Sequence, residues 1–360
     1  MSSERSSTPV PRRSQTPSMS SRAGKACLVT GGGGFLGRHI AEALVAAGHS
    51  VRIFDRVQTF TDSRIDFATG DLTKKSDVIH ACEGMDVVFH VASLTDTWGP
   101  YAPFYNVNVI GTQNIIEACI KNGIKQLVYT SSPSVVFGGE DIENGDESLA
   151  YPATHLNAYC STKAEAEKLV RAANGKDGLL TVSLRPHAMF GPRDNHFFPQ
   201  LFEKAKKGQV KYMVGSAQNI VDFTYVGNVV QAHLLAMDKL VEGSPVCGQA
   251  YFITNGEPIK FWDFMNKVLA KMGFTPPTKN IPFSVAYGLA WTFEWTHWFV
   301  GKIFNFRPPL NRYMVANMCT HHYFSIEKAK TELGYNPETS LEEAVDLTVA
   351  YYKSLELNQK

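Results

Sequence analysis

The fold is decided near the start of the chain by Thr30-Gly31-Gly32-Gly33-Gly34-Phe35-Leu36-Gly37. The apolar run at residues 26–30 leads into these glycines and is typical of a buried strand. Apolar residues at helical spacing follow, from Ile40 to Val45. A strand, a glycine turn and a helix in immediate succession predict the unit that binds a dinucleotide. The glycines let the backbone approach a pyrophosphate, and the start of the helix supplies N–H groups.

A second strand, expected at residues 51–54, ends at Asp55. An acidic residue at this place accepts hydrogen bonds from the adenosine ribose and repels a 2′-phosphate. The sequence therefore predicts NAD as the cofactor. Arg56 follows directly and keeps NADP open as the alternative.

Strand-like and helix-like segments alternate along the next part of the chain. The expected strands are residues 65–69, 86–91, 126–130 and 180–184, and the clearest helices are residues 108–121 and 158–173. This alternation predicts an α/β fold with a Rossmann-type, doubly wound parallel sheet and a smaller C-terminal substrate domain. The expected parts are a disordered tail at 1–24, an NAD-binding domain at 25–190 and a mostly substrate-binding domain at 191–360.

The composition limits the partners and the chemistry. The 360 residues include 35 basic and 34 acidic side chains, a balance that argues against nucleic acid as a partner. The six cysteines are scattered without CxxC spacing, as in reduced proteins and unlike disulfide frames or zinc sites. We therefore expect a reducing compartment and no metal centre.

One of the 14 tyrosines, Tyr159, is alone in having a lysine, Lys163, four residues later. On the helix expected at residues 158–173, this spacing places the phenol and the ammonium on one face. A positive charge beside a phenol favours the phenolate and lowers the pKa of the phenol. Such a tyrosine takes a proton from an alcohol, or returns one to a ketone, near neutral pH.

Together these motifs resemble the extended branch of the short-chain dehydrogenase/reductase family. The other matching segments are Asp71-Leu72, Asn108-Val109-Ile110-Gly111-Thr112, Thr130-Ser131-Ser132, Arg185-Pro186 and the stretch from Ala329 to Pro337. They follow the order of the family from about residue 26 to residue 355, so the resemblance covers most of the chain.

The resemblance implies a role for each matching residue. Tyr159 would be the catalytic acid and base, Lys163 would lower its pKa and bind the nicotinamide ribose, and Ser132 would hold the substrate oxygen. Ser131 is the alternative to Ser132. The implied cofactor-binding residues are Gly31, Gly34, Phe35, Leu36 and Gly37 at the pyrophosphate, Asp55 at the adenosine ribose, Asp71 and Leu72 at the adenine, and Ala92, Lys163, Pro186 and His187 at the ribose or nicotinamide. Asn108 would be a helix-backbone or relay residue.

Two positions distinguish branches of this family with different substrates. Sugar-nucleotide epimerases and dehydratases usually have Asn where this chain has Ala188, and often Arg where it has Val221. Because alanine and valine cannot bind a diphosphate sugar, we expect an apolar substrate site. Residues 185–194, 221–230 and 250–262 resemble the 3β-hydroxysteroid dehydrogenases, and within them the decarboxylating sterol-4α-carboxylate 3-dehydrogenases.

The resemblance implies NAD-dependent oxidation of the 3β-hydroxyl of a 4α-carboxysterol to the 3-ketone with loss of carbon dioxide, a step of sterol biosynthesis. The alternatives are a 3β-hydroxysteroid dehydrogenase/Δ5-isomerase or a 3-ketosteroid reductase, and less favoured are a sugar-nucleotide epimerase/dehydratase or a non-catalytic cofactor-binding protein. His187 and Arg193 are the candidates for binding the carboxylate. We also expect a homodimer.

Residues 281–306 form an apolar stretch that holds Trp291, Trp295 and Trp298. Its uncharged part is shorter than the about 20 residues that a spanning helix needs. The stretch either packs as a helix pair into the C-terminal domain or lies in a membrane interface, where Trp and Tyr are favoured. Sterols are nearly insoluble in water, and related sterol enzymes carry an apolar segment here. We therefore predict a membrane-associated enzyme at the cytosolic face of the endoplasmic reticulum, with the lipid droplet as the alternative.

Overall fold

The computed structural model describes residues 24–195, 197–304, 308 and 310–357, with the backbone alone at residues 298–304. The tail expected at residues 1–24 lies outside the described residues, except for Gly24. Residues 305 and 306 of the apolar stretch also lie outside them.

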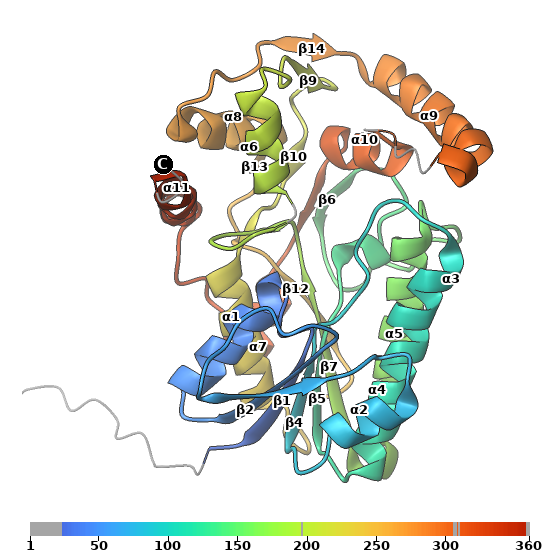
Figure 1. Ribbon diagram of the computed structural model, residues 1–360, viewed down its shortest axis with the longest axis vertical. Helices are drawn as coiled ribbons and strands as arrows, with labels where there is room; N and C mark the ends of the chain where they lie inside the picture. Colours follow the sequence, from blue (N-terminus) through green and yellow to red (C-terminus); the bar gives the residue numbers. More distant parts are fainter. Residues whose placement is uncertain (1–23, 196, 305–307, 309, 358–360) are drawn as a thin grey trace, which may run out of the picture.

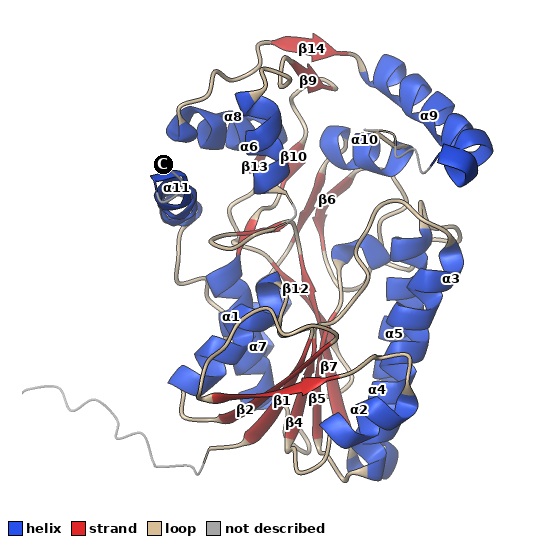
Figure 2. Cartoon of the chain, in the orientation of Figure 1, coloured by secondary structure: helices blue, strands red, loops and turns tan. Residues whose placement is uncertain are grey.

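A parallel sheet of seven strands forms the centre of the structure, in the order β12-β7-β5-β4-β1-β2-β3 (Figures 1 and 2). The strands are β1 (Ala26–Thr30), β2 (Ser50–Asp55), β3 (Ile65–Thr69), β4 (Val87–His90), β5 (Gln126–Thr130), β7 (Leu180–Pro186) and β12 (Ala250–Ile253). The chain winds outward in one direction through β2 and β3 and in the other through β4, β5 and β7. The predicted Rossmann-type fold is confirmed, and the order reverses beside β1, where such sheets bind their ligands.

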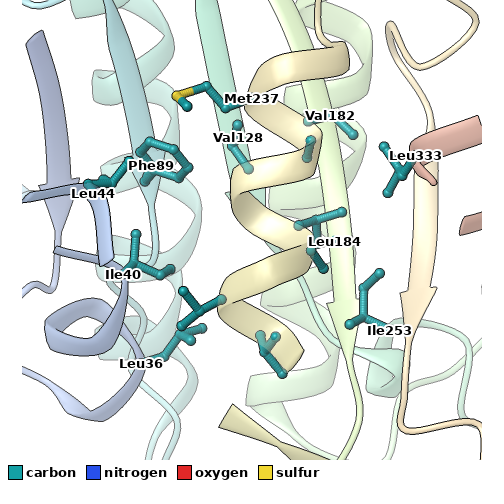
Figure 3. Close-up of a cluster of buried hydrophobic side chains, with 14 of the residues drawn as sticks. Leu36, Ile40, Leu44, Phe89, Val128, Val182, Leu184, Met237, Ile253 and Leu333 are labelled. Atoms are coloured by element: carbon teal, nitrogen blue, oxygen red, sulfur yellow. The ribbon is translucent and has the colours of Figure 1, made fainter. Parts of the chain in front are cut away.

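Helices cover both faces of this sheet (Figure 2). One face carries α1 (Phe35–Ala46) and α7 (Val226–Lys239), and the other carries α2 (Lys75–Ala81), α4 (Gly111–Lys121) and α5 (Ala158–Ala173). Figure 3 shows the core on the α1 and α7 side, where Leu36, Ile40 and Leu44 meet strand residues such as Phe89 and Val128. All five side chains are buried, so burial of apolar surface fixes the start of α1 against the ends of the strands.

The helix expected at residues 108–121 is interrupted. The structure has α3 (Tyr101–Phe104), then a π-helical segment η1 (Tyr105–Ile110), and α4 only from Gly111. The buried Asn108 lies in the wide turn, and its amide bonds both the N–H and the carbonyl of Leu94. Thr112 also donates its hydroxyl to the Asn108 carbonyl. The apolar periodicity alone does not distinguish such a π-helical segment from an α-helix.

A second lobe lies at the carboxyl ends of the central strands (Figure 1). It contains a sheet of four strands in the order β13-β10-β15-β6 and two strand pairs, β11-β8 and β14-β9. Its strands are β6 (Ile142–Gly145), β8 (Met189–Phe190), β9 (Tyr212–Val214), β10 (Ile220–Val221), β11 (Thr224–Tyr225), β13 (Ile259–Lys260), β14 (Lys279–Ile281) and β15 (His322–Phe324). Its helices are α6 (Phe198–Lys206), α8 (Phe261–Met272), α9 (Phe283–Phe304), α10 (Arg312–Cys319) and α11 (Leu341–Leu357).

The two lobes exchange segments of the chain. Strand β6 precedes residue 190 and belongs to the upper sheet, whereas β12 follows it and completes the central sheet. Short one-turn segments, η2 (Pro133–Val135), η3 (Lys176–Gly178) and the π-helical η4 (Ala329–Leu333), connect the larger elements. The division into domains at residue 190 stays a prediction.

A buried ion pair attaches α5 to β7. The guanidinium of Arg185 makes two hydrogen bonds of 3.0 and 2.6 Å to the carboxylate of Glu167, and both side chains are buried. Burial alone raises the pKa of Glu167, but the bonds from Arg185 outweigh it and lower that pKa below its ordinary value. Tyr151 donates a further hydrogen bond to the same carboxylate. The pair thus fixes the helix that carries Tyr159 and Lys163.

We predict that Arg185→Met lowers the free energy of unfolding by about 3–5 kcal/mol, because it leaves the Glu167 charge buried without its partner. Urea unfolding followed by circular dichroism measures the change. The matched control is Arg171→Met on the exposed side of the same helix, for which we expect less than about 0.5 kcal/mol. An equal decrease in the free energy of unfolding in the two variants would contradict the stabilising role assigned to the Arg185–Glu167 ion pair.

Candidate active site

A single cavity of about 780 Å³ runs from the glycine loop to the upper lobe. It is lined by every catalytic and cofactor-binding residue that the sequence proposed: Gly31, Gly34, Phe35, Leu36, Gly37, Asp55, Asp71, Leu72, Ala92, Ser132, Tyr159, Lys163, Pro186 and His187. These residues come from the ends of β1, β2, β3, β4, β5 and β7 and from the starts of α1 and α5. The structure therefore brings them together, although they are spread over residues 31–187 of the sequence.

The glycine loop packs so tightly that no side chain would fit at Gly31 or Gly37. A Cβ at Gly31, whose φ is +68°, would lie 2.8 Å from the Cα of Ala92, and one at Gly37 would lie 2.2 Å from the Gly31 carbonyl oxygen. The first glycine brings β1 against the end of β4, and the last lets α1 start against the loop. The result is an open backbone cradle at a helix N-terminus, the kind of site that accepts a pyrophosphate.

Two carboxylates stand at the far end of the cradle. Asp55 accepts hydrogen bonds from the backbone N–H groups of Gly33 and Arg56, at 3.0 and 2.7 Å. Asp71 accepts from the backbone and the hydroxyl of Thr73, and these bonds lower the pKa of its carboxyl. Both positions are held by backbone contacts, as a rigid binding site for a nucleoside requires.

Ser132 faces Tyr159, and Ser131 does not. The Ser131 hydroxyl oxygen makes no hydrogen bond among the described residues, and its effect is on the pKa of Glu167, which it lowers. Ser132 instead acts on the phenol of Tyr159. Burial raises the pKa of Tyr159 to about 12, against the lowering effect of the Ser132 and Ser134 hydroxyls. The expected lowering of this pKa by Lys163 is therefore not what the structure shows, because desolvation of the phenolate dominates.

Lys163 is fully buried beside the end of β5. Its ammonium donates a hydrogen bond of 2.6 Å to the Thr130 carbonyl and lies 4.3 Å from the centre of the Tyr129 ring. Burial lowers the pKa of Lys163 to about 7, partly offset by the charge of Glu167. Near neutral pH, Lys163 is therefore present in both its neutral and its charged form.

We predict that Lys163→Met stabilises the fold at neutral pH by at least about 1 kcal/mol. An unfolded lysine titrates near about 10.4, so the unfolded chain stays charged between pH 7 and 10 while the folded chain disfavours the charge. Folding must therefore remove the proton from Lys163, and the free energy that this takes grows as the pH falls from 10 to 7. Above the pKa of the unfolded lysine this free energy vanishes. The stabilisation should accordingly shrink as the pH rises.

Urea unfolding of Lys163→Met and of the unchanged protein at several pH values between 7 and 10 measures this difference. Lys168→Met, at an exposed position of the same helix, is the control and should show no such trend. A difference that increases with pH would contradict the assignment.

Two of the sequence candidates lie outside the cavity lining. Arg193 forms a two-pronged ion pair with Glu42 of α1, at 2.7 and 2.8 Å, so its guanidinium is engaged elsewhere. Asn108 connects the loop at Ser93 and Leu94 to Thr162 on α5. Asn108 thus holds the loop at Ser93 and Leu94, which lines the cavity, against α5. This position is compatible with the helix-backbone role expected from the sequence.

The sequence did not point to several residues that complete the cavity. They are Ser134 and Phe137 after β5, Tyr313 and Asn317 on α10, and His322 and Phe324 on β15. The last four follow the apolar stretch and enter the site only because the upper sheet pairs β15 with β6 and β10. No local motif marks them, so only the tertiary fold reveals them.

Comparison with known proteins agrees with this geometry. The sequence model of the 3-beta hydroxysteroid dehydrogenase/isomerase family matches residues 28–284. The chain is 41% identical to mouse sterol-4-alpha-carboxylate 3-dehydrogenase, decarboxylating, over 92% of each chain. It is 40% identical to 3beta-hydroxysteroid-dehydrogenase/decarboxylase isoform 1 of Arabidopsis thaliana, over 91% of this chain and 80% of that protein.

Solved structures share the fold. The UDP-glucose 4-epimerase of Thermotoga maritima superposes with a TM-score of 0.72 over 92% of this chain and 99% of that chain, at 21% sequence identity. At this identity the likeness concerns the fold alone. Ala188 and Val221, the two positions that separated this chain from sugar-nucleotide enzymes, both line the cavity.

Proposed function

The chain belongs to the 3-beta hydroxysteroid dehydrogenase/isomerase family, and from this premise we propose that it oxidises the 3β-hydroxyl of a 4α-carboxysterol with NAD⁺ and releases carbon dioxide. The observation that carries the proposal is the continuous cavity. It joins the glycine cradle to Ser132, Tyr159 and Lys163 and then continues between apolar walls such as Phe223 and Phe261. A rigid apolar ring system suits such walls.

The residues present fit NAD. The glycine cradle leaves room for a pyrophosphate where a Cβ at Gly31 or Gly37 would clash, and Asp55 lies where the adenosine ribose hydroxyls would be bound. Leu72 and Asp71 line the cavity on the adenine side. When bound, the cofactor supplies a hydride acceptor for carbon 3 of the sterol. Lys163 would hold its ribose, at the end of β5.

Proton removal falls to Tyr159. The phenolate of Tyr159 takes the proton of the 3β-hydroxyl as carbon 3 becomes a carbonyl carbon, while Ser132 donates a hydrogen bond to the same oxygen. Since burial raises the pKa of this phenol, positive charge close to it is needed to form the phenolate. In our proposal the ammonium of Lys163, on the next turn of α5, supplies this charge once cofactor and substrate fill the cavity, since in the chain alone it does not offset the burial of Tyr159.

Loss of carbon dioxide needs no additional group. The new 3-ketone lies β to the 4α-carboxylate, so the bond between carbon 4 and the carboxylate breaks and its electron pair forms an enolate. Ser132 and the reprotonated Tyr159 donate hydrogen bonds to the enolate oxygen, where the charge develops. A proton on carbon 4 then completes the ketone product.

We expect the purified protein, given NAD⁺ and a 4α-carboxysterol, to produce NADH and carbon dioxide in equal amounts. Tyr159→Phe should lower kcat by about 10²–10⁴-fold, because the proton acceptor is lost. Tyr212→Phe, at an exposed tyrosine outside the cavity lining, is the control. NADH without carbon dioxide would indicate a 3β-hydroxysteroid dehydrogenase that does not decarboxylate, and full activity of Tyr159→Phe would exclude that residue as the acid and base.

We further propose that α9 rests on the cytosolic surface of the endoplasmic reticulum or of lipid droplets. Within the described residues, no helix is long and apolar enough to cross a membrane. Helix α9 instead packs on α10 through the small residues Ala286 and Ala290. Its other side leaves large apolar side chains about half exposed, namely Phe283, Val285, Leu289, Trp291 and Trp295. A half-exposed apolar helix at the edge of the molecule (Figure 1) suits interfacial insertion.

We predict that the protein sediments with phosphatidylcholine vesicles and that changing Trp291 and Trp295 together to serine lowers the partition coefficient by at least about tenfold. The control changes Leu347 and Leu355, exposed apolar residues of α11, to serine. Equal sedimentation of both double variants would contradict a membrane role for α9.

The expected homodimer stays a prediction, which light scattering of the purified protein tests.

A further inference from the structure

Two histidines meet in the upper half of the cavity. The rings of His187, just after β7, and His322, on β15, contact edge to face with centroids 5.0 Å apart. Both side chains are buried and both line the cavity. Nδ1 of His187 has no hydrogen-bond partner among the described residues. A buried polar atom without a partner is costly and calls for an explanation.

The pair lies close to the reacting groups. His322 packs against the ring of Phe137 at 5.5 Å, and Phe137 follows Ser132 after the short segment η2. His187 follows β7, which pairs with β5, the strand that ends just before Ser131 and Ser132. The histidines therefore line the same cavity as Ser132 and Tyr159, on segments that adjoin the end of β5.

The proposed substrate brings a negative charge into this half of the cavity. Taken from water into apolar surroundings, a carboxylate needs a donor or a positive partner. Among the described lining residues, those able to carry positive charge are Arg56, Lys163, His187 and His322. Arg56 lies beside Asp55 at the cradle, and Lys163 is bonded to Thr130. Arg193, the other sequence candidate, is paired with Glu42.

We propose that His187 and His322 form the subsite that receives the carboxylate on carbon 4 of the sterol, in the cavity that Asn317 of α10 also lines. The inference rests on the proposed function and adds the specificity determinant. Carbon 4 is bonded directly to carbon 3, so its carboxylate must lie next to the groups that hold the 3-oxygen. The histidine pair occupies that position, with aromatic walls on both sides formed by Phe137 and Phe324.

The hydrogen bonds of His322 define how it binds. A carbonyl oxygen only accepts, so Nδ1 of His322 donates to the Thr320 carbonyl at 2.9 Å. Its Nε2 then gains a second N–H only when the ring takes up a proton, and the carboxylate would favour that form. Burial lowers the pKa of both rings, that of His322 to about 4, so without the substrate charge the pair is neutral. The charged and titratable groups that act on it are Asp141 and His321 on His322, and the Asp222 carbonyl on His187.

The test compares two substrates that differ only at carbon 4: a 4α-carboxysterol and the same 3β-hydroxysterol with hydrogen there. The measured quantity is the ratio of their kcat/KM values for NADH formation. His322→Phe keeps an aromatic ring between Phe137 and His187, and Asn317→Asp adds a negative charge to the wall of the same cavity. We expect each variant to lower the ratio at least about tenfold, the effect of losing one charged hydrogen bond or adding a repulsion.

His80→Gln, which changes an exposed histidine on α2 outside the cavity lining, is the control and should keep the ratio. Unaltered NAD⁺ binding and unfolding temperature show that the variants are folded. An unchanged ratio in both test variants, with normal carbon dioxide release by the unchanged protein, would overturn the subsite alone. Absence of carbon dioxide release by the unchanged protein would overturn the proposed function first.

Discussion

The arrangement of the site depends on one buried ion pair, between Arg185 and Glu167. Arg185 belongs to β7 and Glu167 to α5, one turn beyond Lys163, so the pair sets how α5 sits on the sheet. With α5 fixed, Tyr159 meets Ser132 and Lys163 reaches the end of β5. Neither charge has another partner of opposite sign among the described ion pairs. Removal of either would leave the other uncompensated, which makes the contact costly to lose.

Burial, more than proximity, sets the electrostatics of the catalytic groups. The spacing of Tyr159 and Lys163 correctly indicates that they share a helix face, but it contains no information on solvation. In the folded chain desolvation raises the pKa of the phenol and lowers that of the ammonium. Burial thus disfavours the charged form of both groups, strongly for the phenol and enough to leave the lysine partly neutral near neutral pH. A water-filled site with the same two residues would behave differently, because the solvent would stabilise both ions.

Local patterns predicted the lower half of the molecule well. The glycine loop, Asp55 and the strands around them are encoded by neighbouring residues, and the helix expected at residues 158–173 has those bounds in the structure. The upper half was not predictable in this way. His322, Tyr313 and Asn317 reach the cavity through strand pairings between segments far apart in the sequence. The π-helical segment around Asn108 was also missed, because apolar periodicity does not distinguish it from an α-helix.

Helix α10 joins the cavity to the exposed apolar side of the molecule. Tyr313 and Asn317, one turn apart, line the cavity, whereas Val315 and Cys319, also one turn apart, pack toward α9. An ion pair between Glu294 of α9 and Arg312 at the start of α10 holds the two helices together. The same short helix therefore forms part of the substrate wall and the support of the apolar surface. In the proposed orientation of α9 on a lipid surface, α10 is therefore the element through which the apolar side of the molecule adjoins the cavity that holds the catalytic residues.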